Sequence, residues 1–458
     1  TLFRSAPAWL TYNSSTKKLE GIPDDNVSIP RLKIDVTKPG SAEETLGPYA
    51  VTIYGDPLKI FQWHIRNVGQ NSFATYPGIA GNDINQTHTI RDGVTGKAVA
   101  VAVSDTGVEI AHEDLAANII PGASKNYNLP YPYIGDPTPT STTDPTVAHG
   151  TSVAGIIAAV GWNNVGGRGV APKARIAGLN FLAGTQDTAS MIDQANGAFD
   201  VFNYSYGVSS FFSPDEDATY LAQLKYGTIS LRTGKGSLYV KAAGNEFDGM
   251  FPASPPFLSH ADANANCPFV DTFDNVSYFC SFLGNANLGG AENTSPNVVI
   301  VGALSAKGKR SSYSSPGSNI WVSAPGGEFG NADPAILTTD IQGCNKGFSS
   351  NLVSPINSFE RNSSLNQNCN YTSVMNGTSS AAPITSGVIA LMLEANPNLT
   401  WRDVKYILAA TATKTDPTAA STNNPYGNNL SGHTYQRGWV QNSAGFWFHN
   451  WYGFGRVN

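Results

Sequence analysis

The sequence contains few charged residues and no long run of apolar ones. Only 14% of its 458 residues are Asp, Glu, Lys or Arg, against about a quarter in an average soluble domain. The net charge is −6 and Lys and Arg form no block, which gives little support for a nucleic-acid partner. No stretch of about eighteen apolar residues occurs, so we expect no membrane-spanning helix. The hydrophobic content of 41% suffices for a large core.

Cysteine is also scarce. The four cysteines show no Cys-x-x-Cys spacing, which argues against a zinc site. They fall into two pairs that are close in sequence, and we predict the disulfides Cys267–Cys280 and Cys344–Cys369. Disulfides would place the protein in an oxidising compartment, either secreted to the exterior or in transit through the periplasm. Four reduced thiols are the alternative.

Residues 1–45 differ from the rest of the chain. The stretch PAWLTYNSSTKKLEGIP alternates apolar and polar residues around a turn-rich centre, and RLKIDVT follows as another alternating segment. This pattern predicts a β-hairpin and a further strand. The segment resembles the C-terminal half of the Ig-like repeats of bacterial surface proteins. We therefore expect a β-rich N-terminal extension at 1–45, either an Ig-like remnant or a docked extension, and a main domain at 46–458.

From about residue 97 onward, short apolar runs alternate with helical stretches. Runs of this kind suit strands that are buried on both faces of a parallel sheet. The expected strands are 98–103, 174–179, 201–204, 237–242 and 298–303. The expected helices are 151–160, 187–198, 214–232, 379–395 and 400–411. This alternation predicts a doubly wound α/β fold with its active site at the carboxyl edge of the strands.

Three segments carry residues that are suited to the roles of acid, base and nucleophile. Asp105 follows the strand AVAVAVS, where a buried carboxylate needs a cation or an imidazole as its hydrogen-bonding partner. His149 directly precedes a helix that opens with Gly-Thr-Ser. Ser379 stands at the start of the helix in NGTSSAAPITSG, where the helix dipole favours an alkoxide or oxyanion.

Each of these residues taken singly has a plainer interpretation: a turn aspartate, an ordinary helix start and a capping Ser/Thr cluster. The capping interpretation does not explain Gly377, which permits a close backbone approach, or Pro383, which we expect within the first helical turn. Together, the chain order Asp, His, Ser is the order known from subtilisin. The combination therefore points to nucleophilic catalysis by a serine.

The sequence resembles the subtilases, and specifically their kexin/furin-like branch. The matching blocks are VSDTGVEIAHEDL, HGTSVAGIIAAV and NGTSSAAPITSGVIALMLEANPNLTWRDVKYIL, and DPLKIFQWHIRN and GWVQNSAGFWFHNWYGFGRVN resemble the flanking segments of that branch. The chain looks most like secreted bacterial kexin-like serine proteases, over residues 46–458. The resemblance implies a subtilisin-like, mostly parallel seven-stranded sheet and a monomeric serine endopeptidase that works through an acyl-enzyme.

The resemblance also implies roles for individual residues. Asp105 would orient the imidazole, His149 would act as general base and then acid, and Ser379 would be the nucleophile. Asn245, in AAGN, would donate its side-chain amide to the oxyanion, beside the backbone N–H of Ser379. Two backbone segments would bind the substrate as an added strand. They consist of Ser205, Tyr206, Gly207 and of Ala242, Ala243, Gly244.

A calcium site is implied in the same way. Its oxygen ligands would be the side chains of Asp56, Asp114 and Asn163 and the carbonyls of Val160, Val165 and Gly167. Hard oxygen donors of this mix and number suit Ca²⁺, against the plainer interpretation of WNNVGG as a simple turn. At a second calcium site of the branch, near the S1 pocket, the matching positions are Ser210 and Ser315, so we expect no metal there.

Substrate specificity is the last property that the resemblance bears on. Kexin-like enzymes cleave after basic pairs, but Thr106 stands where eukaryotic members carry Asp, and Ser210 and Ser315 bring no negative charge. Asp271 could supply a carboxylate to the S1 pocket, with Asp248 as a second candidate. We therefore expect a preference for Lys or Arg at P1 and loose selection at P2.

The kexin-like branch carries a β-sandwich P domain after its catalytic domain. This chain ends at Asn458, in the closing YGFGRVN segment, so we expect no P domain within it. The partners that we expect are protein or peptide substrates, together with a P domain, a propeptide or an external chaperone or inhibitor.

Two other functions are alternatives to a protease. A catalytically silent binding or adhesion protein on the same fold need not keep Asp105, His149, Ser379 and Asn245 together. A non-peptidase serine hydrolase would be expected to carry a Gly-x-Ser-x-Gly motif, which is not the motif at Ser379.

Overall fold

The computed structural model describes the following parts of the chain, and all structural statements refer to them: 11–13, 18–20, 29–36, 44–51, 55–86, 89–90, 92–141, 143–207, 217–247, 272–273, 276–277, 286–287, 289–350, 356–360, 363–419 and 436–458. Within these ranges, no helix combines the length and the apolar character that crossing a membrane requires.

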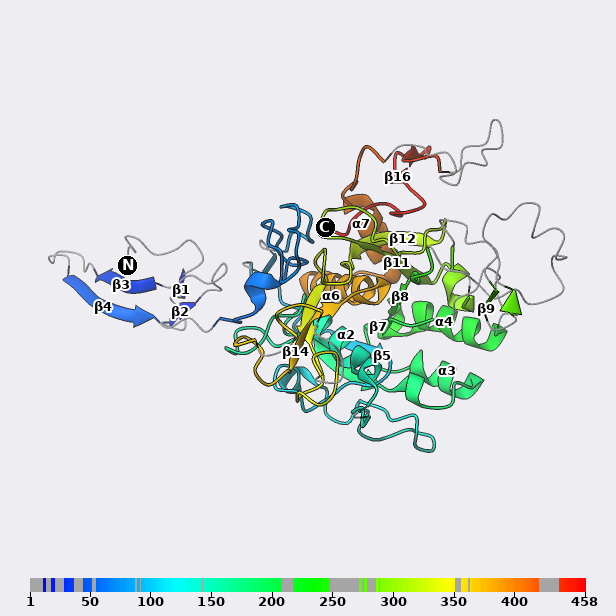
Figure 1. Ribbon diagram of the computed structural model, residues 1–458, viewed down its shortest axis with the longest axis horizontal. Helices are drawn as coiled ribbons and strands as arrows, with labels where there is room; N and C mark the ends of the chain where they lie inside the picture. Colours follow the sequence, from blue (N-terminus) through cyan, green and yellow to red (C-terminus); the bar gives the residue numbers. More distant parts are fainter. Residues whose placement is uncertain are drawn as a thin grey trace.

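A six-stranded parallel sheet lies at the centre of the main domain, with strand order β12-β11-β8-β7-β5-β6 (Figure 1). Its strands are β5 (Ala100–Ser104), β6 (Arg175–Leu179), β7 (Val201–Tyr204), β8 (Leu238–Ala242), β11 (Val298–Leu304) and β12 (Ile320–Pro325). Because β6 and β7 flank β5 on opposite sides, the direction of winding reverses at β5. The predicted doubly wound α/β fold is confirmed, with six strands in the described ranges where seven were expected.

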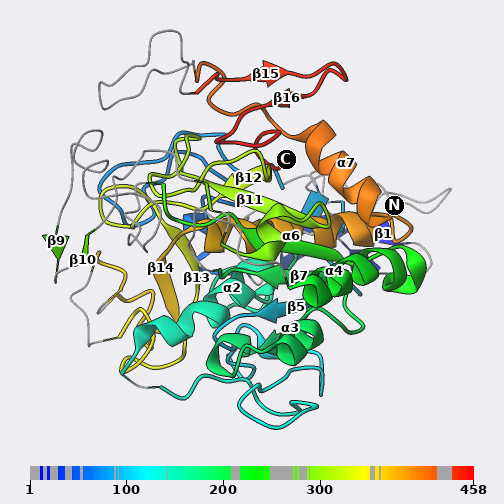
Figure 2. The same cartoon turned by 90° about the vertical axis from the view of Figure 1, so that its right-hand side faces the viewer.

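Helices cover both faces of this sheet, so its strands are buried on both sides (Figures 1 and 2). On β5, Val101 and Val103 belong to one hydrophobic cluster and Ala102 belongs to another. Helices α2 (His149–Ala158) and α6 (Thr378–Ala395) contribute to the first cluster, and α4 (Ala218–Ser230) contributes to the second. Helix α3 (Thr188–Gln194) packs against α4. Burial on two faces explains why the strands are continuous apolar runs in the sequence.

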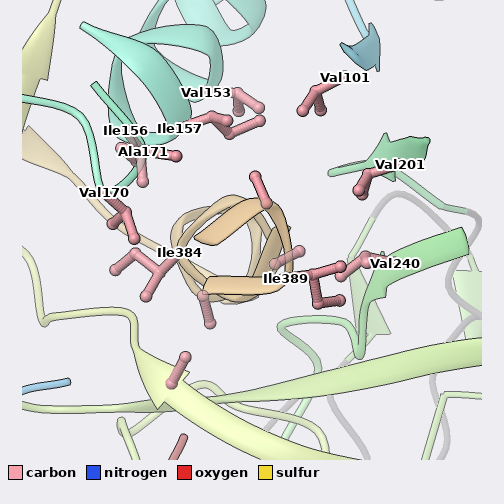
Figure 3. Close-up of a cluster of buried hydrophobic side chains, with 14 of the residues drawn as sticks. Val101, Val153, Ile156, Ile157, Val170, Ala171, Val201, Val240, Ile384 and Ile389 are labelled. Carbon is pink, nitrogen blue, oxygen red and sulfur yellow. The ribbon is translucent and has the colours of Figure 1, made fainter. Parts of the chain in front are cut away.

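Helix α6 runs through the middle of the first cluster. Its Ile384 and Ile389 lie among side chains of α2, β7 and β8 (Figure 3). Small residues on α6 let neighbouring elements come close, because a Cβ atom added at Gly387 would lie only 2.6 Å from the Cβ of Val170. A helix that is buried on nearly all sides has little freedom to shift. The position of its N-terminus, which carries Ser379, is therefore determined by the core.

The main domain contains one further helix, several short antiparallel strand pairs and short 3-10 helices in the described ranges. They are α7 (Trp401–Thr411), the antiparallel pair β13 (Ile336–Thr339) and β14 (Tyr371–Met375), the pair β15 (Val440–Gln441) and β16 (Trp447–Phe448), and the pair β9 (Thr272–Phe273) and β10 (Val276–Ser277). The 3-10 helices are η1 (Lys59–Phe61), η2 (Ala116–Asn118), η3 (Pro145–Ala148), η4 (Phe181–Ala183), η5 (Arg232–Gly234) and η6 (Ala291–Thr294).

The N-terminal region contains the predicted hairpin and the predicted further strand, together with a strand, β4 (Glu44–Val51), that was not predicted from the sequence. β1 (Thr11–Asn13) pairs with β2 (Lys18–Glu20), and β3 (Ile29–Val36) pairs with β4, each antiparallel. These strands pair with one another and not with the six-stranded sheet. β4 crosses the expected boundary between residues 45 and 46, and the division into an extension and a main domain stays a prediction.

The predicted disulfide Cys344–Cys369 is present, and it closes a loop between β13 and β14. The other predicted disulfide, Cys267–Cys280, lies outside the described residues. So do Ser210, Asp248 and Asp271, three of the residues that were considered for specificity.

Candidate active site

Two of the candidate residues follow the carboxyl ends of neighbouring strands. Asp105 comes directly after β5, and Ser205 comes directly after β7. These strands meet at the point where the winding of the sheet reverses, which is where α/β folds form their ligand crevices. The fold therefore brings both residues to one edge of the sheet.

Asp105 and His149 form a hydrogen-bonded pair, which is an ion pair when the imidazole is protonated. His149 Nδ1 lies 2.7 Å from Asp105 Oδ1, and the Asp105 side chain is fully buried while 24% of the His149 side chain is exposed. Burial alone would lower the pKa of His149, but the Asp105 charge and its hydrogen bond outweigh burial and raise that pKa above its ordinary value. Because Asp105 occupies Nδ1, Nε2 is the ring nitrogen that is left to exchange a proton with a substrate or a nucleophile.

Thr106 and Gly150 fix the start of α2 against the loop after β5. The Thr106 hydroxyl donates to the Val147 carbonyl (2.9 Å) and accepts from the Gly150 N–H (3.0 Å). Gly150 has no room for a side chain, because a Cβ atom there would lie 2.2 Å from the Gly107 carbonyl oxygen. Thr106, which was singled out as a departure at the P2 position, thus connects the two segments that carry the ion pair.

Ser379 lies two residues after Gly377, the N-cap of α6, whose φ of 96° favours glycine. Pro383 is in the second turn of α6 and not, as expected, in the first. Since proline has no N–H, the Ser379 carbonyl lacks its usual intrahelical donor. The Ser205 hydroxyl supplies that donor at 3.0 Å, and the Ser379 hydroxyl donates back to the Ser205 carbonyl at 2.9 Å.

Asn245 is held by the residue before Ser379. Its Oδ1 accepts hydrogen bonds from the Thr378 N–H (2.9 Å) and from the Thr378 hydroxyl (3.0 Å). With Oδ1 engaged in this way, Nδ2 is the amide atom that can donate to a ligand. Asn245 is exposed, and it stands beside the first turn of α6, whose N–H groups lack intrahelical acceptors. This arrangement offers two donors to one oxyanion.

These residues open onto one cleft with a volume of about 330 Å³. It is lined by Thr106, Thr146, His149, Leu182, Ser205, Tyr206, Gly207, Ala242, Gly244, Asn245, Glu246, Asn287, Thr378 and Ser379. The two predicted substrate-binding segments therefore both border the cleft, except for Ala243, which is buried in the hydrophobic cluster behind it.

Glu246 is a cleft residue that the sequence analysis did not single out. It is the only carboxylate among the described residues that line the cleft. Its Oε2 accepts hydrogen bonds from the Ser315 hydroxyl (3.0 Å) and from Asn287 Nδ2 (3.2 Å). The only signal for it in the sequence was its position directly after Asn245, since Asn287 and Ser315 come from distant segments.

The predicted calcium ligands also lie together. Asn163 Nδ2 donates to Asp114 Oδ1 (2.7 Å), and the backbone N–H groups of Trp162 and Asn163 donate to Asp56 Oδ1 (2.6 and 3.3 Å). Val160 and Val165, whose carbonyl oxygens were predicted as ligands, belong to the same loop. The Val160 N–H donates to the Asp114 carbonyl (2.8 Å), and the Val165 N–H donates to Asn163 Oδ1 (3.1 Å). Gly167 lies beside the Gln62 amide.

Arg168, which the sequence analysis did not consider, binds one of these carboxylates. Its Nε donates to Asp56 Oδ2 at 2.6 Å, with both side chains buried, and its guanidinium lies 4.2 Å from the centre of the Trp162 ring. Asp114 has no such cation: its Oδ2 is buried without a hydrogen-bond partner in the described ranges. Burial raises the pKa of Asp114 to about 8, and the nearby Asp56 adds to this rise although the Asn163 hydrogen bond opposes it. The cluster thus fits a cation next to Asp114, and an internal cation already neutralises Asp56.

Comparison with known proteins identifies the family. The model of the subtilase family matches residues 96–429. The chain belongs to the subtilase family. It is 40% identical over 418 residues to the Aeromonas extracellular serine protease of Aeromonas sobria, which covers 88% of this chain and 62% of that protein. It is 31% identical over 418 residues to proprotein convertase subtilisin/kexin type 7 of Homo sapiens, covering 88% of this chain and 41% of the relative.

Solved structures agree with this assignment. The crystal structure of the serine protease of Aeromonas sobria aligns with a TM-score of 0.74 and 37% identity, covering 88% of this subtilase and 66% of that chain. The structure of the same protease in complex with a chaperone also has a TM-score of 0.74, with 38% identity over 88% of this chain and 65% of that chain. This subtilase spans about three-fifths of the length of the two Aeromonas relatives that it matches, 62% and 60%. The predicted resemblance to subtilases is confirmed.

The Asp105–His149 pair leads to a prediction about pH. A protonated imidazole cannot act as a base, so kcat/KM should fall as the pH drops through the pKa of His149, which lies above the ordinary value of 6.5. In Asp105→Asn the carboxylate no longer raises this pKa while burial still lowers it. The acid limb of the pH profile should therefore move to lower pH, and kcat should fall by about ten-thousandfold.

The measurement is the pH dependence of kcat/KM on a peptide substrate. Asp200→Asn is the control, because Asp200 is also ion-paired, with Arg232 at 2.9 Å, but does not line the cleft. Acid limbs at the same pH in the wild type and in Asp105→Asn would contradict the assignment.

Proposed function

We propose that this subtilase is a secreted serine endopeptidase that hydrolyses peptide bonds through an acyl-enzyme. The observation that carries the proposal is the meeting, at one cleft, of the His149–Asp105 pair with Ser379 at the start of a buried helix. Its relatives from Aeromonas are named as serine proteases, one of them as extracellular.

In the proposed reaction, the Ser379 hydroxyl passes its proton to His149 Nε2 while its oxygen attacks the scissile carbonyl. Asp105 keeps Nδ1 bonded throughout and stabilises the imidazolium that forms. Asn245 Nδ2 and the Ser379 N–H donate to the developing oxyanion. His149 then protonates the leaving amine, and a water molecule activated by His149 hydrolyses the acyl-enzyme.

The Ser379 hydroxyl must turn before it reacts, because it donates to the Ser205 carbonyl at 2.9 Å in this structure. A rotation about the Cα–Cβ bond breaks this hydrogen bond without moving the helix, which the core holds in place. Catalytic hydrogen bonds of this kind commonly tighten only when substrate is bound.

The nucleophile can be tested with a pair of neighbouring serines. Ser379→Ala should lower the rate of casein hydrolysis by about a millionfold, because the hydroxyl that attacks the scissile carbonyl is removed. Ser380→Ala is the control: the Ser380 hydroxyl is buried and has no hydrogen-bond partner in the described ranges, so its loss should leave the rate near that of the wild type. Comparable rates for Ser379→Ala and the wild type would exclude Ser379 as the nucleophile.

We also propose a preference for Lys or Arg at P1, supported by Glu246. Glu246 lines the cleft, and its carboxylate accepts hydrogen bonds from Ser315 and Asn287. Glu246 can therefore bring negative charge to the cleft at which the P1 side chain binds. Thr106 engages in backbone hydrogen bonds, so nothing comparable supports strict basic selection at P2.

The P1 prediction is tested by Glu246→Gln. Its ratio of kcat/KM for P1 Arg over P1 Leu should fall by about tenfold, because one charge-assisted contact is lost. The matched substitution Asp271→Asn tests the carboxylate that the sequence suggested. An unchanged ratio in Glu246→Gln, with a reduced ratio in Asp271→Asn, would assign the selectivity to Asp271.

Calcium is proposed as a structural ion next to Asp114. The ion would be held by the side chains of Asp114 and Asn163 and by the carbonyls of Val160, Val165 and Gly167. Asp56 would also contribute, although its negative charge is already paired with Arg168. Bound calcium would compensate the buried carboxylate and brace the loop. Among the described residues, no group of three or more Asp, Glu, His or Cys side chains is arranged so that it could hold a metal ion, so most ligands would be amide and carbonyl oxygens.

The calcium proposal predicts a change in thermal stability. Adding calcium to chelator-treated protein should raise Tm by a few degrees, because a ligand that binds only the folded state stabilises it. In Asp114→Asn this rise should disappear, while the metal-free Tm should not fall, since a poorly compensated carboxylate has been removed. Differential scanning calorimetry measures both values. An equal rise in Asp114→Asn would show that calcium binds elsewhere.

A further chain is proposed as a partner. The relative from Aeromonas sobria has been crystallised with a chaperone, which supports a propeptide or an external chaperone for this subtilase. A P domain is proposed as an additional partner from the kexin-like resemblance alone.

A further inference from the structure

Another buried ion pair, in addition to Asp56–Arg168, lies directly behind the cleft. Lys241 of β8 is fully buried, and its Nζ lies 3.2 Å from Glu292 Oε1, which is buried as well. Placing an ammonium and a carboxylate in the interior costs several kcal/mol per ion unless good contacts compensate it. A pair of this kind therefore needs a reason beyond simple packing.

The contacts of Lys241 indicate that reason. Its Nζ donates a hydrogen bond to the Tyr206 carbonyl and lies 5.1 Å from the centre of the Tyr206 ring. A Cβ atom added at Gly207 would be 3.0 Å from Nζ. Tyr206 and Gly207 line the cleft, whereas Lys241 does not. The ammonium thus supports a substrate-binding segment from behind.

The register of the sheet explains why a side chain is needed here. β7 and β8 pair up to Tyr204 and Lys241, and β7 ends at Tyr204. Beyond this point the segment 205–207 leaves the ladder, and its carbonyl groups lose their regular backbone donors. Lys241 reaches across from β8 and supplies a donor to the Tyr206 carbonyl. The same side chain spans the gap between the two segments that border the cleft.

Tyr206 is also held at its other end. Its hydroxyl donates to Gln194 Oε1 at 2.7 Å, and the Ser104 hydroxyl donates to the same oxygen. Ser104 is the residue before Asp105. The ring of Tyr206 is therefore held by the buried Gln194 at the end of α3, and its carbonyl is held by the buried Lys241 of β8. Ser205, next to it, bonds to Ser379.

We propose that the Lys241–Glu292 pair positions the substrate-binding segment Ser205–Gly207 and sets its spacing from Ala242–Gly244. The pair does not touch the reacting atoms; Lys241 is a positioning residue that acts through the Tyr206 carbonyl, and Glu292 compensates its charge. The inference rests on the protease function proposed above and on the role of these segments as the substrate-binding strands.

The test uses Lys241→Met, which keeps the length of the side chain and removes the donor. Because this change leaves Glu292 buried without its cation, Lys241→Met/Glu292→Gln is made as well, so that no unpaired charge remains. For an extended peptide, KM should rise about tenfold in the double variant, as expected for the loss of one hydrogen bond from a charged donor. The value of kcat and the fraction of Ser379 titrated by a fluorophosphonate should stay near those of the wild type.

Lys405→Met is the matched control. Lys405 is another buried lysine whose Nζ donates to backbone carbonyls, those of Pro296 (2.8 Å) and Val298 (3.2 Å), but it lies on α7 and does not line the cleft. It should lose stability with no change in KM. An unchanged KM in the titratable double variant, or an equal rise in Lys405→Met, would overturn the inference. A wild-type protein that fails to react with the fluorophosphonate would instead overturn the protease function, and the inference with it.

Discussion

The carbonyl of Ser379 accepts its hydrogen bond from the Ser205 side chain, because Pro383 cannot donate one. The Ser205 hydroxyl takes the place of the missing helical N–H. This one hydrogen bond joins α6 to the segment that follows β7. The rest of α6 is held in place by the hydrophobic core. Small residues on α6 allow the β-sheet and α2 to pack closely against it. The nucleophile that we propose and the substrate-binding segment are thus parts of one rigid arrangement, as precise positioning of reacting groups requires.

A chain with few charges places several of them in pairs at functionally important points. Asp105 is paired with His149, Asp56 with Arg168, and Lys241 with Glu292. Buried pairs of this type contribute little net stability compared with apolar residues of similar volume. They do, however, impose a defined geometry, since each charge must keep its partner. We propose that these pairs orient the imidazole, the loop around Asp114 and the segment Ser205–Gly207 that lines the cleft.

The sequence alone predicted the fold class, because its strands are continuous apolar runs and its helices alternate with them. It also singled out Asp105, His149, Ser379 and Asn245, each of which lies in a short motif. It missed Glu246, Arg168 and the role of Lys241, since these depend on contacts between distant segments. Asp56 and Arg168, for instance, are 112 residues apart, and no local sequence pattern predicts that their side chains form an ion pair.

The central claim is that Ser379 is activated by the His149–Asp105 pair within this cleft. The most direct measurement is mass spectrometry of proteolytic fragments after the folded protein has reacted with diisopropyl fluorophosphate. We predict a single phosphorylated residue, Ser379, in the wild type, and no adduct in a His149→Ala variant because the hydroxyl is then not activated. An adduct at another residue, or equal modification of Ser379 without His149, would contradict the account.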